Sequence, residues 1–159
     1  MILDAFDRKI LDALQADADQ PIADIAERVG LSQTPCWRRI KRMEESGLIR
    51  KRVVLVDQKL ANLSITVFLA IKAPRHEIEW LERFRKIVID MPEIMEAYRL
   101  TGDSDYLLRI VVPSIEAYDE FYKRMVTKLE FSNMNSSIAM EEMKYTTALP
   151  TSYFRSKAD

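Results

Sequence analysis

Polar and cationic side chains gather between residues 32 and 52, and their types are those that bind an anionic partner. The residues of this segment that could do so are Ser32, Gln33, Thr34, Arg38, Arg39, Lys41, Arg42, Arg50, Lys51 and Arg52. Arg38, Lys41 and Arg42 recur at a spacing close to the helical repeat, which places them on one face of a helix. Guanidinium and amide groups can hydrogen-bond base edges, whereas lysines and a basic turn mainly neutralise phosphates.

The charge distribution supports a local site but leaves an alternative open. Residues 37–59 hold eight Lys and Arg against three acidic residues, a balance of +5, in a chain whose net charge is −1. Such a cluster in a nearly neutral protein indicates a directed anionic partner. On charge alone, a solvated helix face in which Arg38 and Arg42 pair with Glu44 or Glu45 explains the same residues equally well.

A second group of candidate binding residues lies in the turn over residues 101–106. Gly102 lets the backbone turn with open N–H groups, and such groups can hold a carboxylate. Asp103 and Asp105 can accept hydrogen bonds from an ammonium group. Because an α-amino acid carries both groups, the turn predicts a site for one. The alternative is an ordinary β-turn capped by the two aspartates, with Tyr106 in the core.

The composition excludes several classes of protein. Three glycines cannot supply a glycine-rich phosphate loop, and the single cysteine, Cys36, rules out a disulfide within the chain. The single histidine, His76, argues against a histidine metal site and is expected in an exposed loop. No apolar run is long enough to span a membrane, and Asp4 and Asp7 stand where a secretory signal would be basic or apolar. We expect a cytoplasmic protein with no cofactor, no metal and no membrane partner.

The first 50 residues predict three helices in a helix-turn-helix order. Apolar residues at helical spacing begin near Asp4, Pro21 and Ser32, and Gly30 and Gly47 stand where the second and third helices end. The third helix has one apolar and one polar face, as a helix in the major groove of DNA requires. The side chains expected to reach base edges or phosphates from it are Gln33, Thr34, Arg38 and Arg42.

Apolar stretches over residues 48–49 and 53–57 flank the basic turn 50–52. They predict the two strands of a wing, although the turn lacks the Gly or Asn that a tight hairpin prefers. Together with the three helices, this pattern is typical of a winged helix-turn-helix, and it makes double-stranded DNA the expected partner.

The second half of the chain predicts an α+β domain of order βαββαβ, the ferredoxin-like arrangement. The expected strands are 65–73, 93–100, 105–112 and 135–143, and the expected helices are 77–90 and 115–129. Because both helices would cover one face of the sheet, the other face needs cover, and we expect a second copy of the chain to supply it.

Two separate motifs in the chain resemble the Lrp/AsnC family of transcriptional regulators. They are Gly30-Leu31-Ser32-Gln33-Thr34-Pro35-Cys36 followed by Arg39-Ile40-Lys41-Arg42-Met43-Glu44, and Thr101-Gly102-Asp103-Ser104-Asp105-Tyr106-Leu107-Leu108. The resemblance extends from Asp4 to about Leu149. It implies homodimers, often assembled into octamers, whose binding to promoter DNA is tuned by an amino acid. A dimer would read pseudo-palindromic sites.

The resemblance also implies where the effector binds, between dimers and against the turn and the last strand. The implied effector-binding residues are Thr101, Gly102, Asp103, Asp105, Tyr106, Ser136 and Ser137. Stretches such as Thr34-Pro35-Cys36-Trp37 and Lys144-Tyr145-Thr146-Thr147 resemble a branch linked to cysteine-responsive regulation, which makes L-cysteine a candidate effector. The expected domains are a winged helix-turn-helix over 1–57, a connector over 58–63, and an effector-binding and oligomerisation domain over 64–159.

Two other functions stay open at this point. Sirohaem decarboxylases resemble the same family, so an enzyme on this scaffold is one alternative. That chemistry would want histidines around a tetrapyrrole, which the lone His76 fits poorly, and an enzyme has no need of Arg38, Lys41 and Arg42 on one face. A stand-alone effector-binding module is the other alternative, and the complete N-terminal domain argues against it. The main prediction is a DNA-binding transcription regulator, not an enzyme.

Overall fold

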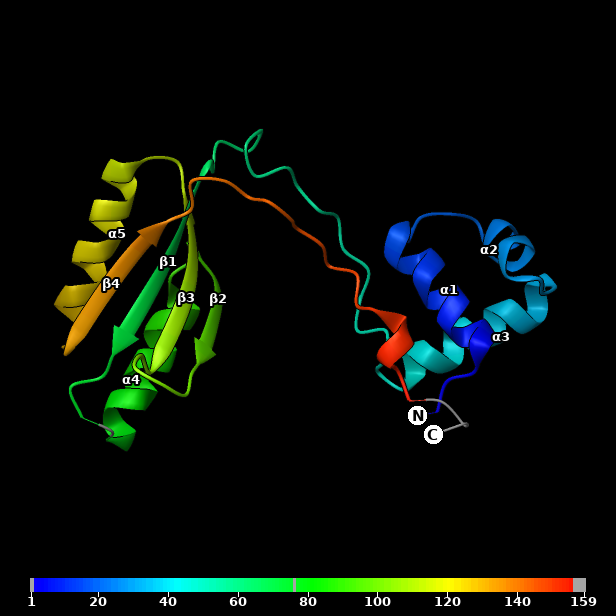
Figure 1. Ribbon diagram of the computed structural model, residues 1–159, viewed down its shortest axis with the longest axis horizontal. Coiled ribbons are helices and arrows are strands. Elements are labelled where there is room, and N and C mark those ends of the chain that lie inside the picture. Colours follow the sequence, from blue (N-terminus) through cyan, green and yellow to red (C-terminus); the bar gives the residue numbers. More distant parts are fainter. Residues whose placement is uncertain (1, 76, 156–159) are drawn as a thin grey trace. The chain divides into compact units, whose positions relative to one another are not determined.

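The computed structural model describes residues 2–75 and 77–155, which fold into two compact units (Figure 1). The first unit comprises the chain up to Val54 and the segment from Lys144 onward, and the second spans Leu55–Met143. The chain from Lys144, expected in the second domain, therefore clusters with the first unit. His76, expected in an exposed loop, lies outside the described residues.

Three helices form the first unit, as the periodicity predicts: α1 (Ala5–Ala16), α2 (Ile22–Val29) and α3 (Gln33–Glu45). Asp4 caps α1 in a capping box with Asp7, and Gly30 ends α2 in the left-handed region at φ 78°. Their core is made of the buried side chains of Leu3, Ile10, Leu11, Ala13, Ile25, Ala26, Val29, Cys36, Ile40 and Met43. Burial raises the pKa of the Cys36 thiol, which fits its role as a small core side chain.

The prediction of two wing strands around residues 50–52 is wrong for the described chain. Residues 50–57 contain no strand, and the side chains of Val53–Val56 are exposed, Val54 by 86%. A strand needs a partner for its N–H and C=O groups, and no described segment pairs with this one. The turn also lacks the Gly or Asn that would close a hairpin.

The second unit is a four-stranded antiparallel sheet of order β2-β3-β1-β4, which confirms the βαββαβ prediction. Its elements are β1 (Ile65–Lys72), α4 (Ile78–Asp90), β2 (Ile94–Arg99), β3 (Tyr106–Val112), α5 (Ile115–Lys128) and β4 (Asn133–Ile138). The expected last strand, 135–143, starts earlier and ends earlier. Its partner β1 begins at Ile65, so the last ladder bond runs from the Ala139 N–H to the Thr66 carbonyl and no strand continues beyond it.

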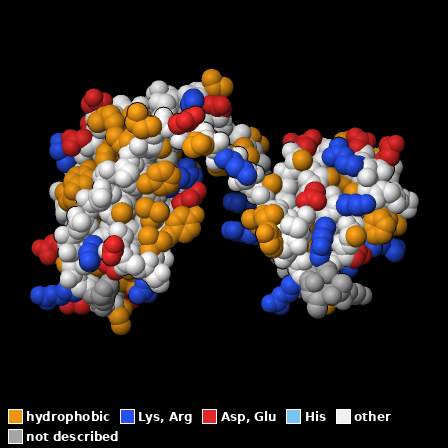
Figure 2. All heavy atoms as spheres, viewed as in Figure 1, with side chains coloured by type: hydrophobic (Ala, Val, Ile, Leu, Met, Phe, Trp, Pro, Cys, Tyr) orange, Lys and Arg blue, Asp and Glu red, His pale blue; other side chains and the backbone are white. Residues whose placement is uncertain are grey.

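Both helices of this unit pack on one face of the sheet (Figure 1). Val67, Leu69 and Ile71 on β1 point to that side and are fully buried, whereas Phe68 on the opposite side is 38% exposed. Period-two alternation in the sequence therefore produces one covered and one open face. Figure 2 shows apolar side chains reaching solvent over this unit.

The end of the chain is part of the first unit. A 3-10 turn, η1 (Thr151–Tyr153), lies against α1. The Thr151 hydroxyl donates to an Asp12 carboxylate oxygen over 2.8 Å, and Gln15 exchanges two hydrogen bonds with the Leu149 backbone. Arg8 donates to the Phe154 carbonyl, and Phe154 packs against the core of the three helices. The helical unit thus depends on residues from both ends of the chain.

Thr151→Val tests this docking, because valine keeps the shape of the side chain and removes its hydroxyl. We expect the free energy of unfolding of the first unit to fall by about 1 kcal/mol, since Asp12 loses a partly buried donor. Urea unfolding followed by far-UV circular dichroism measures the change. In an Asp12→Asn background the same substitution should have a smaller effect, and an equal effect in both backgrounds would contradict the contact.

Candidate nucleic-acid interface and effector site

The outward face of α3, with its N-cap, carries half of the predicted DNA-binding residues. Ser32, Gln33, Thr34, Arg38 and Lys41 are exposed, while Cys36, Ile40 and Met43 turn into the core. Ser32 occupies the N-cap position, and its hydroxyl makes no capping hydrogen bond. The first N–H groups of α3 therefore need an acceptor from outside the helix, which an anion can supply. Figure 2 shows Lys and Arg side chains over the surface of this unit.

The two cations on this face, Arg38 and Lys41, differ in whether they have a partner. Within the described residues Arg38 makes no ion pair or hydrogen bond, so its guanidinium is available to a partner. Lys41 pairs with Glu44 one turn along at 2.9 Å, an exposed contact that contributes little to stability. Its ammonium can exchange this partner for a phosphate at small cost.

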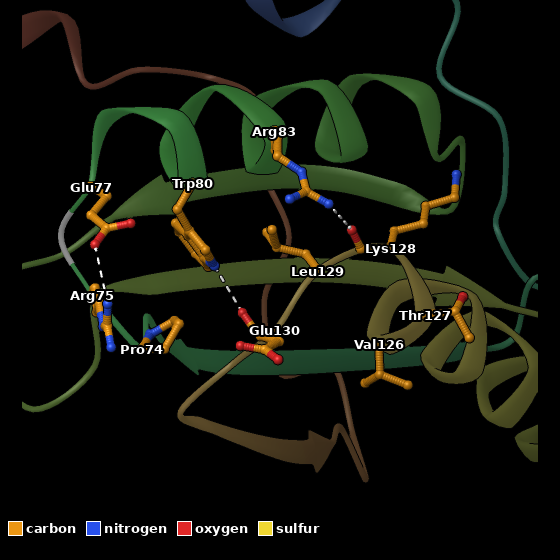
Figure 3. Close-up of a pocket in the computed structure, with 10 residues that line it drawn as sticks. All are labelled: Pro74, Arg75, Glu77, Trp80, Arg83, Val126, Thr127, Lys128, Leu129 and Glu130. Carbon is orange, nitrogen blue, oxygen red and sulfur yellow. Dashed lines mark hydrogen bonds and ion pairs between the residues drawn. The ribbon is translucent and has the colours of Figure 1, made fainter.

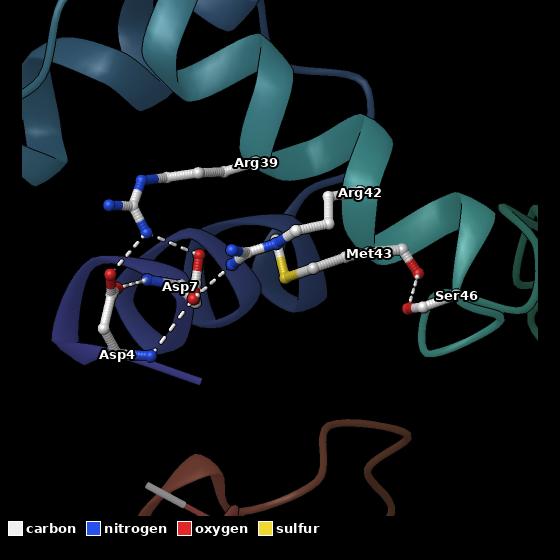
Figure 4. Close-up of polar contacts among 6 residues, drawn as sticks. All are labelled: Asp4, Asp7, Arg39, Arg42, Met43 and Ser46. Carbon is white, nitrogen blue, oxygen red and sulfur yellow. Dashed lines mark hydrogen bonds and ion pairs between the residues drawn. The ribbon is translucent and has the colours of Figure 1, made fainter. Parts of the chain in front are cut away.

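Arg39 and Arg42 turn instead toward α1 and meet a buried carboxylate (Figure 4). Asp7 is 1% exposed, and its two oxygens receive Arg39 Nη1 at 2.8 Å and Arg42 Nη2 at 2.6 Å. Arg39 also binds Asp4 at 2.6 Å. The side chain of Arg42 is still 51% exposed. The alternative pairing of Arg42 with Glu44 or Glu45 is not what the structure shows.

The protonation states in this cluster are fixed by its contacts. Burial lowers the pKa of Arg39, but hydrogen bonds and charges from Asp4 and Asp7 outweigh it, and the net pKa is raised. For Asp4, burial acts to raise the pKa, while the Asp7 N–H and the Arg39 guanidinium lower it overall. Both groups are therefore charged at neutral pH.

The predicted basic turn contributes exposed cations although no paired strands flank it in the described chain. Arg50 and Lys51 are exposed. Arg52 donates to the Ala18 carbonyl over 3.0 Å and lies 3.3 Å from Glu44, so it is tied to the helical unit. Of the three residues, Arg50 and Lys51 are the ones best placed to meet a phosphate.

The turn between β2 and β3 has the predicted open geometry at its tip. Gly102 has φ 119°, a conformation that favours glycine, and Thr101, Gly102 and Asp103 are exposed. Asp105 anchors the other end of the turn, because its carboxylate accepts the Ala73 N–H over 2.8 Å and its own N–H donates to Ile71. The structure thus separates an accessible carboxylate, Asp103, from a structural one, Asp105.

Tyr106 and the two serines are placed differently from the rest of the predicted effector site. Tyr106 is 7% exposed and packs against both Trp80 and Phe84, so it lies in the core, as the alternative of an ordinary β-turn expects. Ser136 and Ser137 lie on β4, the edge of the sheet opposite β2. Ser136 binds the Tyr118 hydroxyl at 2.6 Å. A single chain does not bring these serines to the turn.

An apolar pocket of about 240 Å³ adjoins the turn and was not predicted. It is lined by Leu81, Phe84, Arg85, Val88, Ile89, Ala97, Tyr98, Arg99 and Tyr106. Arg99 and Tyr106 lie on either side of the turn in the chain, so the pocket adjoins the two ends of the turn, while residues 100–105 do not line it. In the sequence the stripe Leu81, Phe84 and Val88 has the spacing of any core-facing helix, and it gave no sign of a pocket.

A larger pocket of about 650 Å³ lies between the start of α4 and the end of α5 (Figure 3). Two of its donors already have partners: Trp80 donates to the Glu130 carbonyl, and Arg83 donates to the Lys128 carbonyl. Arg75 and Glu77 at its rim pair with each other at 3.7 Å. Mixed charges and satisfied donors favour no particular ligand here.

The described residues hold no group of three or more His, Cys, Asp or Glu side chains arranged for a metal ion. Among them there is also no helix with the length and apolar character needed to cross a membrane.

Comparison with known proteins agrees with the architecture. Residues 66–149 match the family described as Lrp/AsnC ligand binding domain, and residues 3–50 match the winged helix-turn-helix DNA-binding family. The DNA-binding transcriptional activator DecR of Escherichia coli is 44% identical over 150 residues, 94% of this chain and 99% of that protein.

Solved structures give the same result. An AsnC family transcriptional regulator from Agrobacterium tumefaciens is 55% identical, with a TM-score of 0.92 over 95% of this chain and 99% of that one. The complex of the regulator NMB0573 from Neisseria meningitidis with L-Met is 32% identical, with a TM-score of 0.89 over 93% and 96% of the two chains. Since these relatives are regulators, the comparisons give no support to the enzyme alternative. The chain belongs to the Lrp/AsnC family of DNA-binding transcriptional regulators.

Proposed function

We propose that this regulator binds promoter DNA through the outward face of α3 and that a small α-amino acid, bound at the β2–β3 turn, adjusts that binding. One observation carries the proposal: the exposed turn with Asp103 and Gly102 opens beside an apolar pocket of about 240 Å³. The recognition face itself is supported by the exposed Gln33, Thr34, Arg38 and Lys41.

The chemistry of the turn fits an α-amino acid in three parts. Asp103 can accept hydrogen bonds from the ammonium group, and the turn's N–H groups or the Arg99 guanidinium can bind the carboxylate. The apolar pocket suits an uncharged side chain of modest size. L-methionine is the first candidate because a similar regulator was solved with it. L-cysteine is the second, on the sequence resemblance to a cysteine-linked branch.

The assembly we propose is a homodimer that covers the open face of the sheet, with octamers built from such dimers. Phe68 is 38% and Tyr98 52% exposed on that face, and their burial by a second copy is favourable. Two copies of α3 then meet two half-sites of a pseudo-palindromic promoter in the cytoplasm. Ser136 and Ser137 would reach an effector only from another subunit.

Arg38→Ala tests the DNA-binding face. Loss of this guanidinium should weaken binding to the promoter of the protein's own gene by about 1–3 kcal/mol if it reads a base. Fluorescence anisotropy over a range of salt concentrations measures the affinity and its slope, which falls by about 0.9 per lost phosphate contact. Lys9→Ala removes an exposed cation from α1 and is the matched control. Equal DNA affinities for the Arg38 variant and the unchanged protein would show that the centre of α3 does not contact DNA.

Asp103→Ala tests the effector site. The variant should bind DNA without effector as the unchanged protein does, and should lose the response to the amino acid, since the ammonium loses its acceptor. Isothermal titration calorimetry with each amino acid, under reducing conditions for L-cysteine, identifies the effector first. Asp119→Ala, an exposed carboxylate on α5, is the control. A response that survives in the Asp103 variant would place the ammonium elsewhere.

A further inference from the structure

The ion-pair cluster between α1 and α3 contains one more cation than is needed to join the two helices. Asp7 is almost fully buried, and each of its carboxylate oxygens is bound by a different arginine of α3 (Figure 4). Arg39 is held three ways: it binds Asp7, it binds Asp4, and its guanidinium lies 5.5 Å from the centre of the Phe6 ring. Arg39 by itself would therefore be enough to neutralise Asp7 and to join the two helices.

Arg42 is the second cation on Asp7, and it is held differently. Among the described residues the only hydrogen bond of its side chain runs from Nη2 to Asp7 Oδ2, while 51% of that side chain is exposed. A guanidinium carries five N–H donors, so the donors of Arg42 that do not bind Asp7 remain available to an acceptor outside the cluster. Arg42 lies on α3 one residue from Lys41 and one turn from Arg38, the cations proposed to meet DNA.

We infer that Asp7 is a positioning residue for DNA binding: it fixes the orientation of Arg42 so that the exposed donors of this side chain contact a DNA phosphate at the flank of α3. An unrestrained arginine would lose rotamer entropy on making such a contact. Arg42 loses less, because the buried carboxylate already restricts it in the free protein. The inference rests on the proposed use of α3 as the DNA-binding face.

The direction of the change in DNA affinity distinguishes the positioning role of Asp7 from simple electrostatic attraction. Asp7→Asn removes a negative charge close to the DNA-binding face, so attraction alone predicts tighter binding to a polyanion. Positioning predicts weaker binding, because the amide releases Arg42. A merely structural role also predicts a loss, but one that does not depend on the side chain at position 42.

The experiment compares the unchanged protein, Asp7→Asn, Arg42→Ala and the double variant by anisotropy on the same promoter DNA at one salt concentration. We expect Asp7→Asn to weaken binding about fivefold or more, and to have no further effect once Arg42 is alanine. Asp4→Asn is the matched control, because it removes a carboxylate that binds Arg39 and not Arg42. The Asp4→Asn variant should bind the DNA with an affinity within twofold of that of the unchanged protein, because an exposed ion pair contributes little.

Several results would overturn the inference. Equal or tighter binding by Asp7→Asn contradicts it, and so does a loss of the same size in the Arg42→Ala background. If neither Arg38→Ala nor Arg42→Ala changes the affinity, the proposed α3 interface itself has failed; if Arg38→Ala weakens binding and Asp7→Asn does not, only the positioning role has failed.

A measurement on the unchanged protein covers the case in which Asp7→Asn does not fold, which circular dichroism would reveal. In ¹⁵N spectra of the arginine side chains, the guanidinium signals of Arg42 should be as protected from exchange as those of Arg39, before and after DNA is added. Arg38 has no side-chain partner among the described residues, so Arg42 signals averaged like those of Arg38 would contradict a fixed orientation.

Discussion

The burial of one carboxylate, Asp7, sets the geometry of the DNA-binding unit. A buried charge is costly unless it is paired, and removing one partner of such a pair is strongly destabilising. Asp7 meets this requirement only when α3 lies across α1 with Arg39 and Arg42 on the near flank. The same placement turns Arg38 and Lys41 outward. The orientation of the proposed recognition face is thus tied to the pairing of an acidic side chain 32 residues earlier than Arg39 in the chain.

In the second unit another aspartate, Asp105, likewise fixes the position of a segment. Asp105 uses its carboxylate and its backbone to join the β2–β3 turn to the end of β1, which leaves Gly102 and Asp103 at an exposed tip. In each unit, therefore, one aspartate forms contacts within the fold, Asp7 in the first and Asp105 in the second. A polar side chain near it stays exposed. Residue type alone does not distinguish the two, since Asp103 and Asp105 are equivalent in sequence terms and differ only in the donors around them.

Much of the fold could be predicted because it depends on local patterns. Helical periodicity, Gly30 and Gly47 at helix ends, and period-two alternation in β1 and β3 are all readable from neighbouring residues. The errors concern long-range partners. Residues 53–57 and 140–143 look like strands but pair with nothing described, and the docking of Thr151 on Asp12 joins residues 139 positions apart. Arg42 was assigned to DNA without its partner Asp7, for the same reason.

The internal pairing of cations also bears on how a nearly neutral chain can bind DNA. Of the cations between residues 37 and 59, Arg39 and Arg42 are paired with Asp7, and Lys41 and Arg52 with Glu44. The local charge of +5 therefore overstates the charge that is free to displace counterions from the duplex. Affinity from one such unit must be modest, and it must depend on where the few available guanidinium groups are held. Two units on one promoter add their phosphate contacts, so the modest charge of α3 is itself an argument for a dimer on DNA.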